Sequence, residues 1–240
     1  MSSKLRENFL MEIMLRLEFP SIPELIGEDG DSSIFYNIVK SEFSNNNSHE
    51  ENLIESDLND EGTIKNSEKN KVWIYKHENI KKLILENSSV TLFYTGELFN
   101  PNDLFNDIDL IIKALKELSV ENINLITLRY INEITPKSKI KNWDDWINLK
   151  LHNFEFQPKN SNIIRSLSMA EYRIDEYNLI FQYGQFNLNY PSTIIRDDFV
   201  LDYSCSYNYL ESINNIKDHV INMNEIIHDF YNESIVKFNK

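Results

Sequence analysis

The chain of 240 residues lacks several features that place a protein in a functional class. It has one cysteine, Cys205, so no disulfide can form within it, which fits a reducing compartment. It has 5 glycines and no phosphate-binding run of the G-x-x-x-x-G-K type. No stretch approaches the roughly 20 apolar residues that span a bilayer, and no signal peptide is recognisable. We therefore expect a cytoplasmic protein without membrane segments.

Positive charge is also scarce. Lys and Arg together number 24 against 38 Asp and Glu, which gives a net charge of −14. A field of this sign repels phosphate backbones and anionic lipids and attracts basic proteins and cations. We therefore expect a basic protein as the partner, rather than nucleic acid or a membrane. The oligomeric state is left open by this pattern.

Residues arranged for catalysis are equally scarce. Cys205 falls inside a strand-like run, where nothing activates a thiolate, and no serine lies in a G-x-S-x-G elbow. The 5 histidines never recur at the i, i+4 spacing of a helical metal site. Acidic pairs such as Asp107 with Asp109 are interpreted as helix-capping or solvated groups, with a hard-cation site as the alternative. The sequence thus predicts no catalytic residue, no metal site and no cofactor.

The apolar residues that are present predict strands and helices in alternation. Alternating side chains mark a strand at residues 9–19, and further β-rich runs lie at 72–75, 82–85, 90–94, 123–134, 166–173, 178–183, 186–189 and 199–207. Gly184 and Gln185 are read as a tight turn between two of these strands. Helical spacing is found at 34–43, 101–118, 143–149 and 211–237.

This order predicts an α+β fold with two similar lobes, each an antiparallel β-meander followed by a packing helix. The first lobe is expected over residues 1–135 and the second over 136–240, ending in a long C-terminal helix. Residues 44–70 are dominated by Asn, Ser, Glu and Asp, and they offer too little apolar surface to offset the entropy of ordering. They are predicted to form a mobile acidic loop.

Arg129 is the most informative single residue. It shares a strand face with Ile123, Leu125 and Ile131, so its guanidinium is expected to be partly buried and therefore paired. Glu12, on a strand of matching character, is the candidate partner. The pair has two readings: an ion pair that fixes strand register, or a ligand site in which Arg129 binds a carboxylate or phosphate.

Three passages together resemble a sporadically distributed family of uncharacterised prokaryotic proteins of about this length. They are Glu12–Pro20, the Leu-Arg-Tyr-Ile-Asn signature within Leu128–Ile134, and Val200–Asp202 before a long terminal helix. The resemblance covers nearly the whole chain apart from the acidic loop. It implies an α+β fold and supplies no activity; the occurrence of such genes beside mobile and defence genes is its functional hint.

Two functions follow as hypotheses. The first is a non-catalytic binding or regulatory protein that acts through a protein partner, in a defence or toxin-neutralising setting. The second is a small-ligand or nucleotide binder, with or without hydrolysis, that uses Arg129 with nearby carboxylates.

Overall fold

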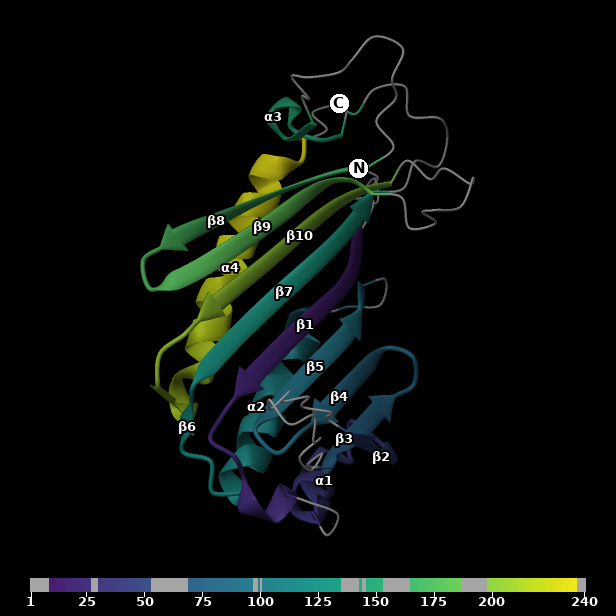
Figure 1. Ribbon diagram of the computed structural model, residues 1–240, viewed down its shortest axis with the longest axis vertical. Helices are drawn as coiled ribbons and strands as arrows, with labels where there is room; N and C mark the ends of the chain where they lie inside the picture. The colour runs from purple at the N-terminus through teal and green to yellow at the C-terminus, as the bar shows by residue number, and fades with distance from the viewer. Residues whose placement is uncertain are drawn as a thin grey trace, which may run out of the picture. The chain divides into compact units, whose positions relative to one another are not determined.

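The computed structural model describes residues 9–26, 30–52, 69–96, 99, 101–134, 143, 146–152, 165–186 and 198–236. They form an α+β fold with a large antiparallel sheet (Figure 1). The strands of the large sheet are β1 (Leu10–Glu18), β2 (Asn45–Asn52), β3 (Lys69–His77), β4 (Lys81–Leu85), β5 (Ser89–Thr95), β7 (Leu125–Ile134), β8 (Ser166–Ile174), β9 (Tyr177–Phe186) and β10 (Asp198–Tyr207). Two short strands, β6 (Asn122–Ile123) and β11 (Glu211–Ser212), pair separately. The α-helices are α1 (Ser33–Val39), α2 (Pro101–Glu117), α3 (Leu149–His152) and α4 (Ile216–Ser234), and single 3-10 turns occur at Pro23–Leu25 and Ile213–Asn215.

The chain divides into two compact units. Unit 1 comprises Met1–Ile13, Thr127–Tyr207 and His219–Lys240, and unit 2 comprises Met14–Ile126 and Asn208–Asp218. The division into lobes at residues 135 and 136, and the likeness of the two lobes, stay predictions.

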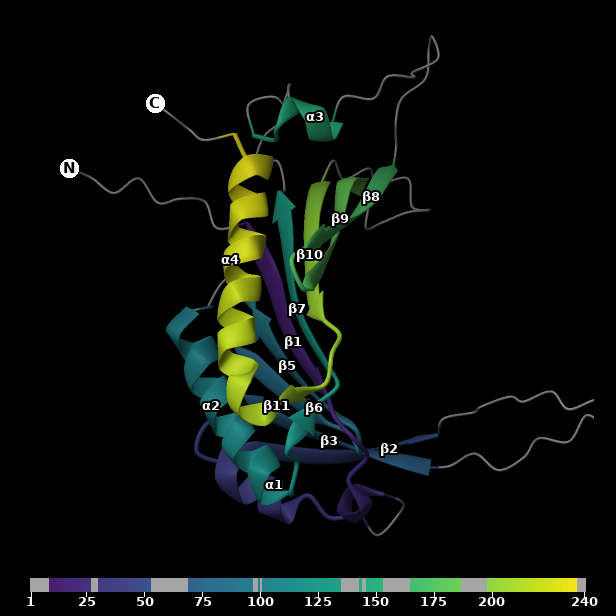
Figure 2. The same ribbon diagram turned by 90° about the vertical axis from the view of Figure 1, so that its left-hand side faces the viewer.

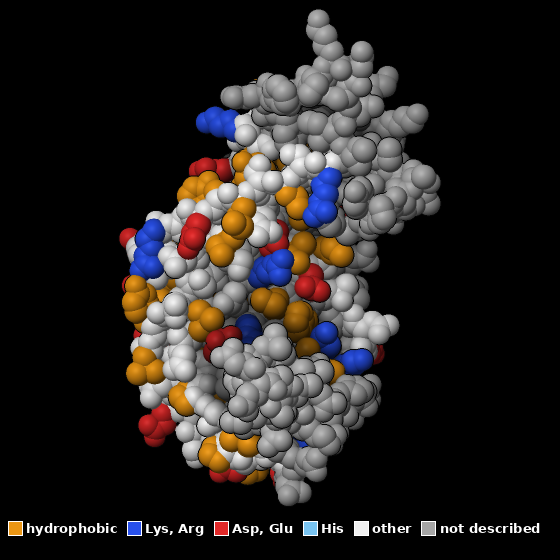
Figure 3. Space-filling view, in the orientation of Figure 1, with side chains coloured by type: hydrophobic (Ala, Val, Ile, Leu, Met, Phe, Trp, Pro, Cys, Tyr) orange, Lys and Arg blue, Asp and Glu red, His pale blue; other side chains and the backbone are white. Residues whose placement is uncertain are grey.

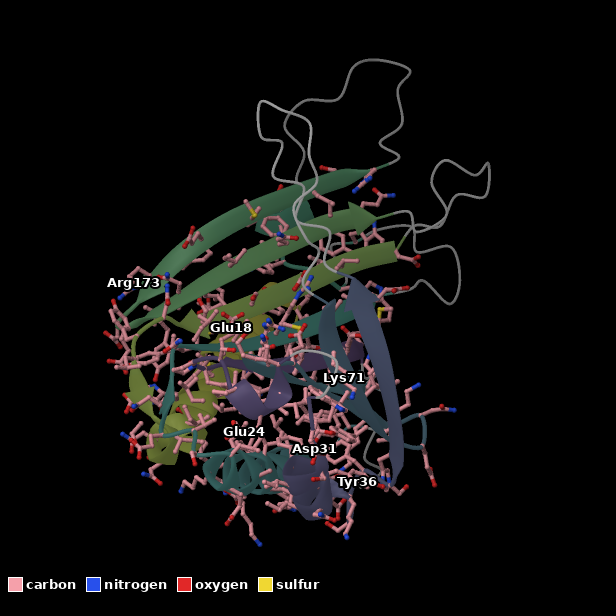
Figure 4. The ribbon with its side chains drawn as sticks, turned by 60° about the horizontal axis from the view of Figure 1, so that its bottom comes forward. Glu18, Glu24, Asp31, Tyr36, Lys71 and Arg173 are labelled. Atoms are coloured by element: carbon pink, nitrogen blue, oxygen red, sulfur yellow. The ribbon has the colours of Figure 1, made fainter. Side chains whose placement is uncertain are left out.

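In unit 2 the strands follow the order β2-β3-β4-β5-β1, and the described pairs are antiparallel. Helix α2, predicted at 101–118, begins at a proline, which suits the first helical position. Its buried stripe, at helical spacing, consists of Leu104, Ile108, Ile111 and Leu115. Helix α1 contributes Phe35 and Tyr36, whose rings stack on Tyr75 of β3. Figure 4 shows Tyr36 on α1 and Lys71 on β3 in the same part of unit 2. The Lys71 ammonium donates to the Gly30 carbonyl.

In unit 1 the strand order is β7-β10-β9-β8, and the first residues of β1 lie beside β7. Helix α4 runs along one face of these strands (Figure 2). The Tyr130 hydroxyl of β7 donates to Asn224 of α4 at 2.6 Å, and Tyr203 of β10 packs edge-on against Tyr231. Because side chains alternate along a strand, the neighbours of these tyrosines project from the opposite face. We call that opposite face of unit 1 the open face.

The prediction of a loop at 44–70 is wrong at both ends, where residues 45–52 and 69–70 are strand residues. Residues Asn45–Asn52 form β2 and pair antiparallel with β3, from Asn45 opposite Lys76 to Asn52 opposite Lys69. Backbone hydrogen bonds to a neighbouring strand do not require apolar side chains, so the polar composition concealed the strand. Residues 53–68 of the predicted loop lie outside the described residues.

The predicted turn at Gly184 and Gln185 is also wrong, because β9 runs unbroken from Tyr177 to Phe186. Gly184 lies inside the strand opposite Leu167 with φ +147°. A Cβ atom at residue 184 would lie 1.9 Å from the Ser166 carbonyl oxygen. The glycine is therefore required by the close approach of β8 rather than by a turn.

Three helices differ from the prediction. The helix predicted at 34–43 is α1, which ends at Val39. The helix predicted at 143–149 is wrong over residues 146–148, which are not helical: Ile147 forms an isolated β-bridge with Ile235. The short helix α3 follows at Leu149–His152, and the Asn148 side chain caps its first turn by accepting from the Lys150 N–H at 3.1 Å. The terminal helix begins at Ile216 rather than 211, because Glu211 and Ser212 pair as β11 with β6. Ser212 then caps the intervening turn by accepting from the Asn214 N–H.

Candidate functional site

Arg129 projects from the open face of unit 1. Its neighbour Tyr130 bonds to α4, so strand alternation directs Arg129 to the other side of β7. On β10 the same alternation places Asp202 on the open face, because Tyr203 packs against α4. Two strands adjacent in the sheet thus present a guanidinium and a carboxylate on one face.

The two groups form a bidentate ion pair. Arg129 Nε donates to Asp202 Oδ1 at 2.8 Å, and Arg129 Nη2 donates to Asp202 Oδ2 at 2.6 Å. The Arg129 side chain is 39% exposed and that of Asp202 is 11% exposed, so water reaches the guanidinium from one side. These hydrogen bonds are the main cause of a raised Arg129 pKa, and burial opposes them. This geometry holds both side chains in fixed orientations.

Glu12, the partner expected from the sequence, acts on Arg129 differently. Its charge contributes to raising the pKa of Arg129, so the carboxylate lies within electrostatic range. The hydrogen bonds of Arg129 in the described part of unit 1 go to Asp202 instead. The alternation on β1 and β7 is enough to place Glu12 and Arg129 on one face, but it does not reveal that β10 flanks β7 on the other side. Two carboxylates, Asp202 and Glu12, therefore act on one guanidinium, and the three side chains together carry one net negative charge.

Exposed apolar side chains accompany these charges on the open face. Met169 is 70% exposed and Leu167 is 47% exposed on β8, and Ile180 of β9 is 36% exposed. Met169 is also contacted by Gln182, whose amide lies 3.4 Å from the sulfur. Figure 3 shows apolar side chains interspersed with charged ones over this side of the molecule. On a sheet face in contact with water, the side chains are usually polar. The exposed apolar side chains on the open face are therefore unusual.

Helix α4 turns an acidic side outward. Glu225, Asp229 and Glu233 follow one another at four-residue spacing and are exposed. The same spacing brings their side chains to one stripe of the helix surface. Unit 1 therefore carries carboxylates both around Arg129 and along α4.

Sequence reasoning missed a buried charged cluster in unit 2. Lys81 of β4 donates to both oxygens of Asp107 of α2, at 2.9 and 2.8 Å, and to Glu42 at 3.2 Å. The Tyr94 hydroxyl also donates to Asp107. Burial raises the pKa of Asp107, and the bonds from Lys81 and Tyr94 oppose that effect. The ammonium further lies 4.9 Å from the Phe43 ring centroid.

The interpretation of Asp107 as a capping or solvated group is therefore wrong: its side chain is buried. A signal for this was present in the sequence. Asp107 follows Leu104 by three residues and precedes Ile111 by four, which places it within the apolar stripe of α2. Lys81 likewise shares a strand face with the buried Leu83 and Leu85. An isolated charge on a buried face predicts that a partner of opposite sign is needed, but the sequence does not say which residue supplies it.

A second cluster in unit 1 surrounds His219 of α4. The His219 ring lies 4.0 Å from the Tyr207 ring, between centroids, and its Nδ1 is 2.9 Å from the Tyr177 hydroxyl. Asn222 donates to the same hydroxyl at 3.1 Å. These contacts of His219 and Asn222 hold α4 against β9 and β10, so we assign the cluster a structural role.

Cys205 is buried on β10, and burial raises the pKa of its thiol to about 12, so the thiolate is suppressed. In the described part of the chain, no three His, Cys, Asp or Glu side chains are grouped so that they could hold a metal ion. None of the described helices is both long enough and apolar enough to cross a membrane.

Comparison with known proteins adds no assignment to this geometry. No protein-family model matches the chain, and no curated protein matches it.

Proposed function

We propose that this chain is a non-catalytic binding protein that engages a basic protein partner through the open face of unit 1. The observation that carries the proposal is the exposure of Met169, Leu167 and Ile180 on a sheet face that also bears carboxylates. Interaction surfaces combine an apolar centre with a polar rim, and exposed apolar side chains in water are costly unless a partner covers them. The open face supplies both components.

The charge around Arg129 favours a basic partner. Asp202 occupies two donors of the guanidinium, and Glu12 adds a second negative charge nearby. The net charge of −14 for the whole chain has the same sign and accelerates encounter with positively charged proteins. Lys and Arg side chains of a partner would find carboxylates to accept their hydrogen bonds.

The alternative is a small-ligand or nucleotide binder, with or without hydrolysis, in which Arg129 and nearby carboxylates hold the ligand. An anionic ligand would have to displace Asp202 from Arg129 or approach two carboxylates. Both are unfavourable for a phosphate or carboxylate group. We therefore favour the protein-binding function.

We further propose that binding is regulatory. A protein that acts on nucleic acid presents a basic, phosphate-contacting surface, and an acidic protein can cover that surface and block it. A nuclease or another nucleic-acid-binding protein therefore has the required chemistry. This agrees with the toxin-neutralising or defence setting that the family resemblance suggests.

The experiment uses the tagged chain to isolate a partner from its source cells and then measures binding with the purified partner. Two variants raise the net charge equally, by one: Met169→Lys on the open face and Glu225→Gln on the outer side of α4. We expect Met169→Lys to weaken binding about tenfold or more, and Glu225→Gln to change it less than about twofold. Equal effects of the two variants would place the interface elsewhere.

Salt dependence tests the electrostatic part of the proposal. The association rate should fall by about tenfold or more between about 0.05 and 0.5 M salt, because screening removes long-range attraction. A rate that does not change with salt rejects this mechanism. The alternative function is tested separately: nucleotide turnover by the purified chain that disappears in Arg129→Ala would favour it.

A further inference from the structure

Strand β8 ends the sheet of unit 1. In the described part of the chain it pairs with β9 alone, over a continuous register from Ser166 opposite Gln185 to Ile174 opposite Tyr177. Edge strands are usually protected from pairing by proline, by charged side chains (above all lysine), by a bulge or by a short length. β8 is nine residues long and regular, it contains neither proline nor lysine, and its two charged side chains, Glu171 and Arg173, are of opposite sign. Its outer edge is thus suited to accept another strand.

The β8–β9 connection determines which backbone groups point outward. Only Asp175 and Glu176 lie between Ile174 and Tyr177, which face each other across the hairpin. In a two-residue hairpin the closing pair exchanges both hydrogen bonds, and hydrogen-bonded pairs then alternate along the ladder. Tyr172 therefore bonds towards β9, whereas the N–H and C=O groups of Glu171 and Arg173 point away from it.

The side chains at this edge are self-complementary. Glu171 and Arg173 project from the open face on either side of Tyr172, and Figure 4 shows Arg173 close to the end of β8. Tyr172 projects from the other face, where its ring packs edge-on against Phe230 with centroids 5.1 Å apart. Tyr172 is still 41% exposed, so the described residues leave part of it uncovered.

We infer that a second copy of this chain binds here, with the two β8 strands antiparallel about a two-fold axis at Tyr172. This axis sets Glu171 of each copy opposite Arg173 of the other, which gives two opposite-charge pairs. The backbone groups of these two residues are the ones that point outward, so the same pairs exchange the backbone hydrogen bonds. The two Tyr172 rings meet at the axis and extend the contact with Phe230.

The charges select this axis over its neighbour. An axis at Ala170 would set Glu171 opposite Met169 and Arg173 opposite Leu167, so each charge would face an apolar side chain. The Tyr172 axis gives every charge a partner of opposite sign. Arg173 already donates to the Asp175 carbonyl at 2.9 Å and to Asn178 at 2.8 Å.

The association is expected to be weak and to strengthen with salt. A short strand-to-strand contact belongs to the small interfaces typical of transient complexes. Two copies that each carry a net charge of −14 repel one another, and salt screens this repulsion. Partner binding by the open face should respond to salt in the opposite direction, so failure of one proposal is distinguishable from failure of the other.

The first experiment measures sedimentation of the full chain at increasing concentration and at two salt concentrations. We expect a reversible monomer–dimer equilibrium in the micromolar range, shifted towards dimer at the higher salt. A chain that stays monomeric at about 0.5 mM protein and about 0.5 M salt overturns the inference. Larger, open-ended aggregates would also contradict it, because a two-fold contact of this kind closes on itself.

The second experiment locates the axis by oxidation of single introduced cysteines in the native background. Tyr172→Cys should form an intermolecular disulfide, because a residue on the axis meets itself as a close, non-hydrogen-bonded pair. Ala170→Cys is the matched control on the same strand face, and its two copies would lie too far apart. If the Ala170→Cys variant forms the disulfide and the Tyr172→Cys variant does not, the assigned axis is wrong.

Charge reversal tests the same arrangement without a cysteine. Glu171→Arg and Arg173→Glu should each weaken dimerisation about tenfold, because each sets like charges opposite one another. The double variant restores opposite charges and should restore dimerisation to within about threefold of the original chain. A double variant as weak as the single ones would contradict the proposed pairs.

Discussion

Arg129 of β7 and Asp202 of β10 are joined by two hydrogen bonds, Nε to Oδ1 at 2.8 Å and Nη2 to Oδ2 at 2.6 Å. The pair links adjacent strands across the open face and leaves Glu12 to act on Arg129 through its charge. A bidentate pair of this kind fixes geometry as well as contributing energy.

The first prediction concerns this pair. A double-mutant cycle with Arg129→Met and Asp202→Asn should give a coupling energy of about 1–2 kcal/mol, between the values for exposed and buried ion pairs. The same cycle with Glu12→Gln in place of Asp202→Asn should give less than about 0.5 kcal/mol, because Glu12 makes no direct hydrogen bond in the described structure. Both are measured by urea unfolding, and equal coupling in the two cycles would contradict the assignment.

The buried cluster of unit 2 gives a larger effect. Lys81→Met leaves the Asp107 carboxylate buried without its cation and should lower the free energy of unfolding by about 3–5 kcal/mol. The double variant Lys81→Met, Asp107→Leu should lose clearly less than the sum of the single variants, since neither charge is then left alone. The control is Lys82→Met, the next residue on β4, whose ammonium lies over the Phe93 ring; it should cost less than about 1 kcal/mol.

Gly184 should be intolerant of a side chain. Gly184→Ala places a Cβ atom against the Ser166 carbonyl and holds alanine at φ +147°, so the β8–β9 ladder must shift. We expect a loss of about 3 kcal/mol or more in the free energy of unfolding. Gln185→Ala, one residue further along β9, is the control and should change it by less than about 1 kcal/mol. A mild effect of Gly184→Ala would show that β8 and β9 separate easily.

Cys205 should remain protonated in the folded chain at alkaline pH. Burial raises its thiol pKa to about 12, whereas an unfolded cysteine has a pKa of about 8.5. Because the folded value is the higher one, this contribution to stability is complete below pH of about 8.5 and is lost as pH rises towards 12. The native chain should therefore lose free energy of unfolding relative to Cys205→Ala as the pH rises from about 9 to about 11.

The same burial predicts the reactivity of the thiol. Alkylation of the folded chain at about pH 8.5 should be limited by unfolding, whereas the chain in denaturant should react at once. Rapid alkylation under native conditions would show that β10 is not protected as the structure has it.

The sequence by itself determined the elements whose own residues carry a periodic pattern. The alternation in residues 9–19 gave β1, and the helical stripe that begins at Leu104 gave α2, because one buried face must recur at 2.0 or 3.6 residues. The α+β class and the antiparallel sheet follow from the order of these elements. Arg129 was found for the same reason, as a charge among apolar residues on one strand face.

Only the tertiary structure decided features that depend on a second segment. β2 forms because β3 supplies hydrogen-bond partners, so its own polar sequence gives no sign of it. Gly184 is required by Ser166, and the buried position of Asp107 is satisfied by Lys81; each partner lies 18 or more residues away in the chain. Asp202, rather than Glu12, holds Arg129 because β10 and β7 are adjacent in the sheet. Periodicity reports which face a side chain occupies, but the partner on that face is set by strand order, which arises from packing of the whole chain.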